Sequence, residues 1–147
     1  MTLCVVHNNT RVLLGMKKQG FGAGRWNGFG GKVHEGETVE AAAKRELHEE
    51  AGIVPIAIEK EGTLTFEFEG NPELLEVHLF RVNEFSGEPT ESEEMRPQWF
   101  SHTDIPFHEM WPDDRFWLPR FLAGKRTSGY FLFKDENTLL RHHIEEA

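Results

Sequence analysis

Three glutamates at the end of one predicted helix constrain this chain more than any other feature. Segment 31–53 reads GKVHEGETVEAAAKRELHEEAGI and contains Glu46, Glu49 and Glu50. Residues three and four positions apart share a helix face, so these like charges repel by roughly 0.2–0.5 kcal/mol per pair. They also occupy the last turns, where the helix dipole favours cations. Because Mg²⁺ binds carboxylate oxygens alongside phosphates, a bound cation would reverse the sign of this interaction. The pattern therefore predicts a metal-binding helix.

The order of the remaining elements predicts an α/β fold. Thr38 is a suitable N-cap for the glutamate helix, and Gly52 a suitable end. Hydrophobic periodicity predicts strands at 3–6, 11–16, 63–69, 76–82, 96–101 and 130–133, and a second helix at 112–122 that Pro119 bends or shortens. We expect a mixed β-sheet sandwiched between α-helices. A length of 147 residues favours one domain, residues 1–147.

Charge and composition exclude several classes of partner. Sixteen basic and twenty-five acidic residues give a net charge of −9, which disfavours duplex nucleic acid. The sequence has no apolar run long enough to span a membrane. Cys4 is its one cysteine and can form no internal disulfide, which suits a reducing compartment. We expect a cytoplasmic protein, and a monomer.

The glutamate helix resembles the signature of the Nudix hydrolases. That signature reads Gly, five residues, Glu, seven residues, then Arg-Glu-aliphatic-any-Glu-Glu-any-Gly-aliphatic. Every fixed position matches without a gap, at Gly31, Glu37, Arg45, Glu46, Leu47, Glu49, Glu50, Gly52 and Ile53. The resemblance implies hydrolysis of a phosphoanhydride with Mg²⁺, or with Mn²⁺ in its place.

The same resemblance implies roles for individual residues. It assigns metal binding to Glu46, Glu49, Glu50, the carbonyl of Gly30, and Glu94 in a later loop. Arg45 is expected to orient the carboxylates. One of Glu46, Glu50 or Glu94 should deprotonate the attacking water, and the sequence does not choose among them. The simpler interpretation, a solvated acidic face with an Arg45–Glu49 pair, explains one of the acids but not all three.

A second resemblance extends over residues 2–133 and concerns the substrate. Segments 15–30, 94–97 and 105–114 resemble a branch of the Nudix family, found in animals, that acts on oxidised purine nucleoside triphosphates. It implies conversion of 8-oxo-dGTP and 2-hydroxy-dATP to the monophosphate and pyrophosphate, which removes damaged precursors from the nucleotide pool. The implied substrate-binding residues are Thr2, Lys17, Phe21, Asn27, Phe66, Leu75, Trp111, Asp113, Asp114 and Trp117. Leu75 departs from the methionine typical of that branch.

The residue types suit a purine. Aromatic faces stack on a base, worth about 1–3 kcal/mol per base. Two adjacent carboxyls such as Asp113 and Asp114 cannot both ionise cheaply in a dry pocket, so one can keep its proton and donate to a purine oxygen. Taken singly, the same residues have simpler interpretations: first-turn acids of a helix for Asp113 and Asp114, core residues for Trp111 and Trp117.

Two other functions stay open. The same metal site could serve methylated purine triphosphates or another nucleoside diphosphate derivative. A domain that binds nucleotide without cleaving it is a third possibility, although such domains usually lose signature acids and this chain retains all of them.

Overall fold

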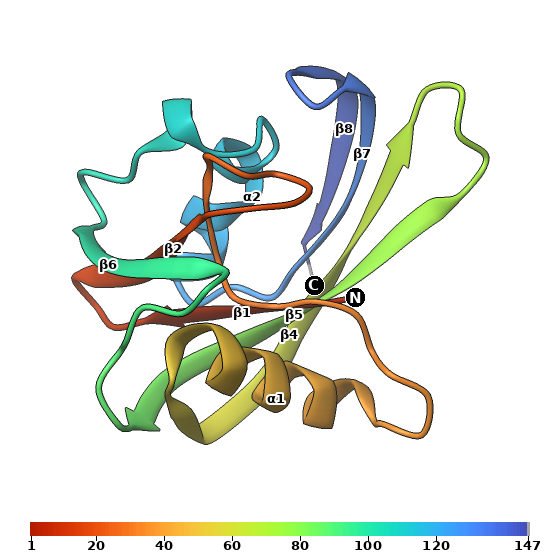
Figure 1. Ribbon diagram of the computed structural model, residues 1–147. Coiled ribbons are helices and arrows are strands. Elements are labelled where there is room, and N and C mark those ends of the chain that lie inside the picture. The colour runs from red at the N-terminus through yellow and green to blue at the C-terminus, as the bar shows by residue number, and fades with distance from the viewer. Residues whose placement is uncertain (147) are drawn as a thin grey trace.

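The computed structural model describes residues 1–146, and it shows one mixed β-sheet with a helix on each face (Figure 1). Within those residues eight strands form the sheet. The strands are β1 Thr2–His7, β2 Arg11–Lys17, β3 Trp26–Asn27, β4 Val54–Phe68, β5 Leu74–Ser86, β6 Met95–Ser101, β7 Thr127–Asp135 and β8 Thr138–Glu146. The helices are α1 Val39–Ala51, the 3₁₀ turn η1 Phe107–Glu109 and α2 Asp114–Leu122.

The sheet combines parallel and antiparallel pairs. Its order is β3-β2-β1-β5-β4-β7-β8, and β6 pairs with β2. β1 lies parallel to β5 and β4 lies parallel to β7, whereas the other pairs are antiparallel. The predicted α/β class with a mixed sheet between helices is therefore confirmed.

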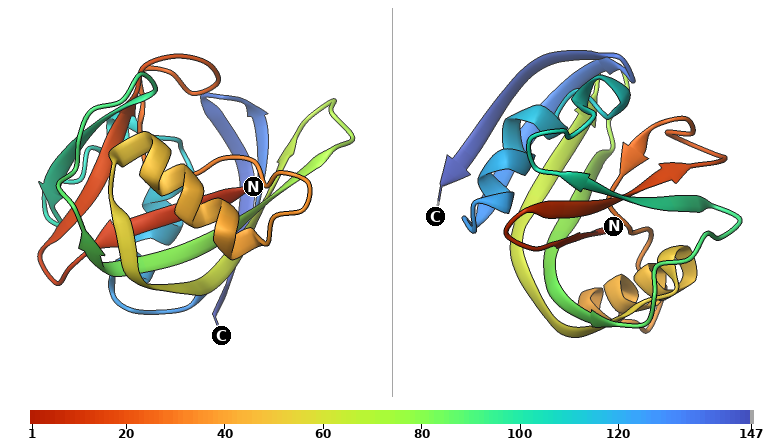
Figure 2. Two further views of the ribbon diagram at one scale, coloured as in Figure 1. Left: turned by 60° about the horizontal axis from the view of Figure 1, so that its bottom comes forward. Right: turned by 90° about the vertical axis from the view of Figure 1, so that its left-hand side faces the viewer.

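Alternation along the central strands divides the core in two. In β1, Val5 points to one face of the sheet, and Cys4 and Val6 point to the other. The first face packs against α2, for example against Trp117, and the second packs against α1. Two views show the helices on opposite sides of β1 and β2 (Figure 2). Both faces of the central strands are thus buried.

The ends of α1 have the predicted caps. The Thr38 side chain accepts a hydrogen bond from the Ala41 backbone N–H at 3.1 Å, and Gly52 ends the helix in the left-handed conformation at φ 73°. The second helix begins two residues later than predicted, at Asp114, and it contains Pro119. A proline inside a helix removes one backbone donor, and α2 spans nine residues.

Two strands are much longer than the sequence predicts. β4 spans Val54–Phe68 and β5 spans Leu74–Ser86, instead of 63–69 and 76–82. The first half of β4 carries Glu59, Lys60 and Glu61, and three register shifts interrupt its pairing with β5. These polar residues and irregularities break the alternation from which strands are predicted. The tail from Thr138 forms β8 on β7.

Within residues 1–146 neither helix is long and apolar enough to cross a bilayer.

Candidate active site

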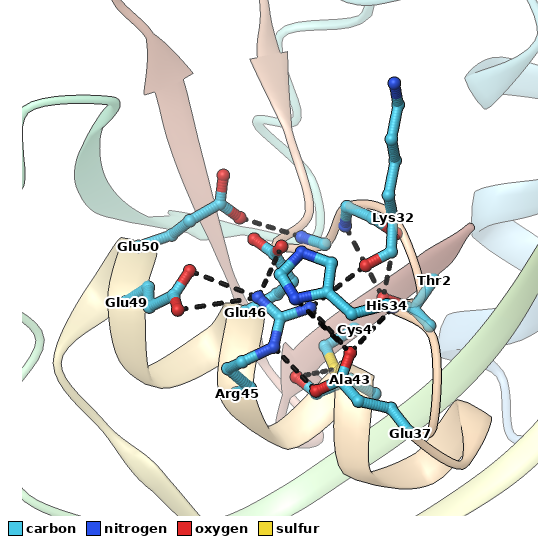
Figure 3. A network of polar contacts seen from close by, with 12 residues as sticks. Thr2, Cys4, Lys32, His34, Glu37, Ala43, Arg45, Glu46, Glu49 and Glu50 are labelled. Carbon is cyan, nitrogen blue, oxygen red and sulfur yellow. Dashed lines mark hydrogen bonds and ion pairs between the residues drawn. The ribbon is translucent and has the colours of Figure 1, made fainter.

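The C-terminal half of α1 carries an acidic ridge, formed by Glu46, Glu49 and Glu50, beside the Arg45 guanidinium (Figure 3). Arg45 Nε and Nη2 donate to the two Glu37 carboxylate oxygens at 2.7 and 2.9 Å. Its Nη1 donates to Glu46 at 2.9 Å and more weakly to Glu49 at 3.3 Å. Nη2 also donates to the Lys32 carbonyl at 3.0 Å. The arginine therefore ties the loop before α1 to the ridge.

Glu50 is the buried member of the ridge. It is 4% exposed, and its Oε1 accepts a hydrogen bond from the Gly30 backbone N–H at 2.8 Å. Burial is the main cause that raises the Glu50 pKa, to about 8; the Gly30 hydrogen bond opposes the rise, and the nearby Glu46 and Glu94 carboxylates add to it. Burial also raises the pKa of Glu46. A nearby cation would therefore stabilise the ionised form of both acids.

Backbone without side chains makes room for the ridge. A Cβ atom at Gly31 would lie 2.6 Å from the Glu46 carboxyl carbon, and one at Gly30 would lie 1.8 Å from the Thr2 carbonyl oxygen. The Thr2 N–H donates to the Gly31 carbonyl at 2.8 Å. Position 30 requires glycine because a side chain there would collide with the Thr2 backbone, whereas a side chain at position 31 would displace the Glu46 carboxylate.

The loop that carries Glu94 is fastened at two points. Lys18 N–H donates to the Glu94 carbonyl at 2.8 Å, and Lys18 Nζ contacts Glu91 and the Ser92 carbonyl. Ser92 Oγ donates to the Glu50 carbonyl at 2.9 Å. The sequence analysis missed Ser92 and Lys18, because nothing local marks a serine or lysine whose partner lies more than forty residues away.

The residues of the ridge have the ligand chemistry that suits a divalent cation, but their side chains are not arranged around a common point. Within residues 1–146 no three Asp, Glu, His or Cys side chains converge closely enough to hold a metal ion. Arg45 holds Glu46 and Glu49, and Gly30 holds Glu50. Glu46 and Glu94 nevertheless lie close enough to Glu50 to raise its pKa. An all-oxygen donor set with a buried carboxylate is what Mg²⁺ prefers.

An aromatic cavity of about 160 Å³ adjoins the ridge, and Glu50 and Gly30 form part of its wall. The structure places every predicted substrate-binding residue on this cavity: Thr2, Lys17, Phe21, Asn27, Phe66, Leu75, Trp111, Asp113, Asp114 and Trp117. These residues come from β1, β2, β3, β4, β5, α2 and two loops. Their role in binding stays a prediction.

Aromatic rings support one another around the cavity. Phe66 stacks on Phe131 with ring centroids 5.6 Å apart. Trp111 meets the Phe133 ring edge-on at 6.1 Å and the Phe21 ring at 5.0 Å. Phe66 therefore contacts both the core and the cavity. Indole and phenyl faces so arranged suit a flat heteroaromatic ligand.

Asp113 and Asp114 form a buried acid pair, 3% and 4% exposed. Trp117 Nε1 donates to Asp113 Oδ2 at 2.8 Å, whereas Asp114 Oδ2 is buried with no hydrogen-bond partner. Burial raises the pKa of both carboxyls, and the Asp113 charge raises that of Asp114 further. Asp113 directly precedes α2 and Asp114 lies in its first turn, as the simpler interpretation has it, but both carboxyls are buried, whereas ordinary first-turn acids face solvent.

Further cavity residues escaped the sequence analysis. They are Met1, Leu3, Gly28, Leu64, Phe68, Val77, Met95 and Phe133. The alternation of Leu64, Phe66 and Phe68 along β4 was the available signal, because all three lie on one face of the strand. For Phe133 there was none, since its position depends on the parallel pairing of β7 with β4.

The fold and the acidic ridge define the class of this protein: it belongs to the NUDIX domain family, whose model matches residues 2–121. Two relatives within this family match nearly the whole chain and have the same name. The chain is 56% identical over 146 residues to the oxidized purine nucleoside triphosphate hydrolase of Mus musculus, covering 99% of this chain and 94% of that protein. It is 53% identical to the Danio rerio protein of the same name, covering 100% and 94%. Among solved structures it is similar to a MutT protein from Bacillus halodurans, with a TM-score of 0.87, 27% identity, and coverage of 98% and 95%.

Proposed function

We propose that this protein hydrolyses oxidised purine nucleoside triphosphates, including 8-oxo-dGTP and 2-hydroxy-dATP, to the monophosphate and pyrophosphate in a Mg²⁺-dependent reaction. One observation carries the proposal: a cavity with a buried acid pair shares Glu50 and Gly30 with the acidic ridge. A purine in the cavity would place its phosphates toward the carboxylates. The names of two relatives that match nearly the whole chain support the same substrate class.

The chain provides two kinds of recognition. In the aromatic cavity, the carboxyl of the acid pair that keeps its proton donates to a purine oxygen, and the ionised one accepts from purine N–H groups. Aromatic rings hold the base by stacking. The Asn27 amide and the Lys17 ammonium, both on the cavity wall, add hydrogen-bond donors, and the lysine adds positive charge near the phosphates.

The ridge would hold the cation. Bound Mg²⁺ supplies the positive charge that a polyphosphate needs for displacement at phosphorus. Arg45 keeps the carboxylates oriented through its contacts with Glu37 and Glu46. The ligands we propose are the carboxylates of Glu46, Glu49, Glu50 and Glu94 and the Gly30 carbonyl.

Side-by-side kinetics test the function. Purified protein with Mg²⁺ should hydrolyse 8-oxo-dGTP and 2-hydroxy-dATP with a higher kcat/KM than dGTP, O6-methyl-dGTP or ADP-ribose, and release pyrophosphate. A clear preference for O6-methyl-dGTP would favour the methylated-purine alternative. A preference for ADP-ribose would overturn the assignment of the cavity. Tight nucleotide binding without turnover would identify a binding domain instead.

We also propose a monomeric, cytoplasmic enzyme that does not bind duplex nucleic acid. The support is the net charge of −9 and the burial of Cys4, which raises the pKa of its thiol to about 12 and keeps it from oxidation chemistry. Light scattering would check the oligomeric state, and cell fractionation would check the compartment.

A further inference from the structure

We propose that Arg25 is a positioning residue for base recognition: its guanidinium holds Trp111 and the adjoining glycine loop against the β7–β8 turn and so fixes the outer wall of the aromatic cavity. Arg25 belongs neither to the predicted site residues nor to the cavity lining. This inference rests on the proposed function, because it concerns how the same cavity holds a purine.

The first support is a stacked cation. The Arg25 guanidinium carbon lies 4.5 Å from the centre of the Trp111 ring. Trp111 lines the cavity and Arg25 does not, so the guanidinium covers the indole from outside. Phe21 contacts the same indole at 5.0 Å between ring centroids and does line the cavity. Trp111 is thus contacted by one residue of the cavity wall and by one residue that does not line the cavity.

The second support is a clamp to a distant part of the chain. Arg25 Nη1 donates to the Glu136 carbonyl at 2.8 Å, and Nη2 donates to Asn137 Oδ1 at 2.5 Å. Both acceptors lie in the turn between β7 and β8. A planar guanidinium can stack and donate in two directions at once, which an ammonium cannot do.

The third support is the loop that needs such a clamp. Residues 18–25 join β2 to β3 and contain Gly20, Gly22 and Gly24, all with φ between 77° and 86°. Glycines with positive φ leave a loop with high conformational freedom. A Cβ atom at Gly22 would lie 3.2 Å from Trp111 Nε1, so the loop backbone packs directly on the indole. Backbone hydrogen bonds between Lys17 and residues 24 and 25 close the loop on itself, and Arg25 joins this closed loop to the β7–β8 turn.

The charge of Arg25 also reaches the acid pair. Burial raises the Asp113 pKa, and the Arg25 cation is one of the groups that oppose this rise. The other charged or titratable groups on the cavity wall are Asp114, Lys17 and Glu50. Arg25 therefore acts on the cavity through Trp111 and, at longer range, through Asp113.

Arg25→Met and Arg25→Lys in the Mg²⁺-loaded enzyme test the inference. Arg25→Met should raise KM for 8-oxo-dGTP about three- to tenfold, the range of one partly exposed cation–π contact, and leave kcat within about twofold. The dissociation constant of 8-oxo-dGMP, measured by tryptophan fluorescence, should rise by the same factor. Arg25→Lys keeps the positive charge but not the planar guanidinium with its two donors. Its KM and its dissociation constant should lie between those of Arg25→Met and wild type.

The matched control is Arg11→Met. Arg11 also lies over an indole, at 5.0 Å from the centre of the Trp99 ring, but neither residue lines the cavity. It should leave KM and product binding unchanged. Asn137→Ala removes one clamp acceptor without touching Trp111, and it should raise KM about twofold, which keeps the test open should Arg25→Met fold poorly.

Two results would overturn the inference. One is an unchanged KM and product affinity in Arg25→Met, and the other is a fall in kcat with KM constant. Failure of the proposed function gives a different result, namely wild-type protein that does not cleave oxidised purine triphosphates. The variant-to-wild-type ratio tests Arg25, and wild-type turnover tests the function.

Discussion

At the end of α1, charged side chains lie close together and partly open to solvent, whereas in the aromatic cavity two acids lie buried among rings. The acidic ridge is held by ionic contacts to Arg45, and the acid pair is held by one indole N–H. Both regions raise carboxyl pKa values through burial, but only the ridge gathers several carboxylates of the kind that a divalent cation prefers as ligands. The comparison teaches that similar acids can serve as charged ligands in one place and as a proton-holding reader in another.

Glu50→Gln should give the largest effect and should affect only the ridge. Turnover of 8-oxo-dGTP should fall by about 10²–10⁴-fold, the range for loss of an acid–base or charge-bearing group. Binding of 8-oxo-dGMP should stay within about threefold, because the neutral amide still fits the wall of the cavity. Steady-state kinetics and fluorescence titration measure the two quantities.

Glu40→Gln, on the exposed side of α1, is the control for that change and should leave turnover intact. If Glu50→Gln weakened product binding as much as turnover, the two regions would not be separable.

Asp114→Asn should affect the cavity rather than the ridge. The amide introduced at position 114 cannot pass a proton to or accept one from the Asp113 carboxyl, so the proton of the pair can no longer reside on either of two carboxyls. We expect kcat/KM to fall about 10- to 100-fold for one of 8-oxo-dGTP and 2-hydroxy-dATP and clearly less for the other. Competition kinetics with both substrates measure the ratio.

Asp104→Asn changes an exposed acid in the loop after β6 and should leave the ratio unchanged. An equal loss for both substrates in Asp114→Asn would show that the pair does not discriminate by proton position.

The pH dependence of stability distinguishes the two regions by their response to Mg²⁺. Since burial raises the folded pKa of Glu50 and of the acid pair, the folded state keeps protons that the unfolded chain releases above about pH 4. Their contribution is fully present below that pH and is lost as pH rises toward the folded pKa, by up to about 1.4 kcal/mol per pH unit per group. For Glu50 that window ends at about pH 8.

Thermal melts between pH 5 and 8.5 check this prediction. Adding Mg²⁺ should recover stability at high pH in the wild type and not in Glu50→Gln. Asp114→Asn should have a shallower pH dependence with or without the metal. A Mg²⁺ effect that persisted in full without the Glu50 carboxylate would move the cation away from the ridge.

Leu75→Met should give the smallest effect. The two side chains have similar volumes, and exchanges of this kind usually cost little in packed sites. We expect KM for 8-oxo-dGTP to change by no more than about threefold. A larger change measured in the same assay would make the cavity wall at β5 a determinant of substrate choice.

The ridge could be predicted from the sequence because it is local: its three acids lie within five residues on one helix with recognisable caps. The fold class followed from periodicity. The cavity was different, since residues between positions 2 and 117 meet there from six helices and strands and two loops, and only a resemblance to known proteins could group them.

What escaped the sequence depends on contacts at long range. Arg25 binds Glu136 and Asn137, which lie 111 and 112 positions later in the sequence. The place of Phe133 on the cavity wall depends on the pairing of β4 with β7. The burial of Asp114 follows from how α2 packs, not from any property of an Asp-Asp pair. The first half of β4 could not be predicted as a strand, because one side of that segment faces solvent and carries polar residues.

Gly30 sets the spacing between the two regions. Its backbone touches the Thr2 carbonyl on one side and donates to Glu50 on the other, with no side chain between them. Under the proposed function, the distance between the base-binding cavity and the acidic ridge is therefore fixed by main-chain contacts. Substitutions in the cavity wall can then alter which heterocycle is accepted without moving the bond to be cut.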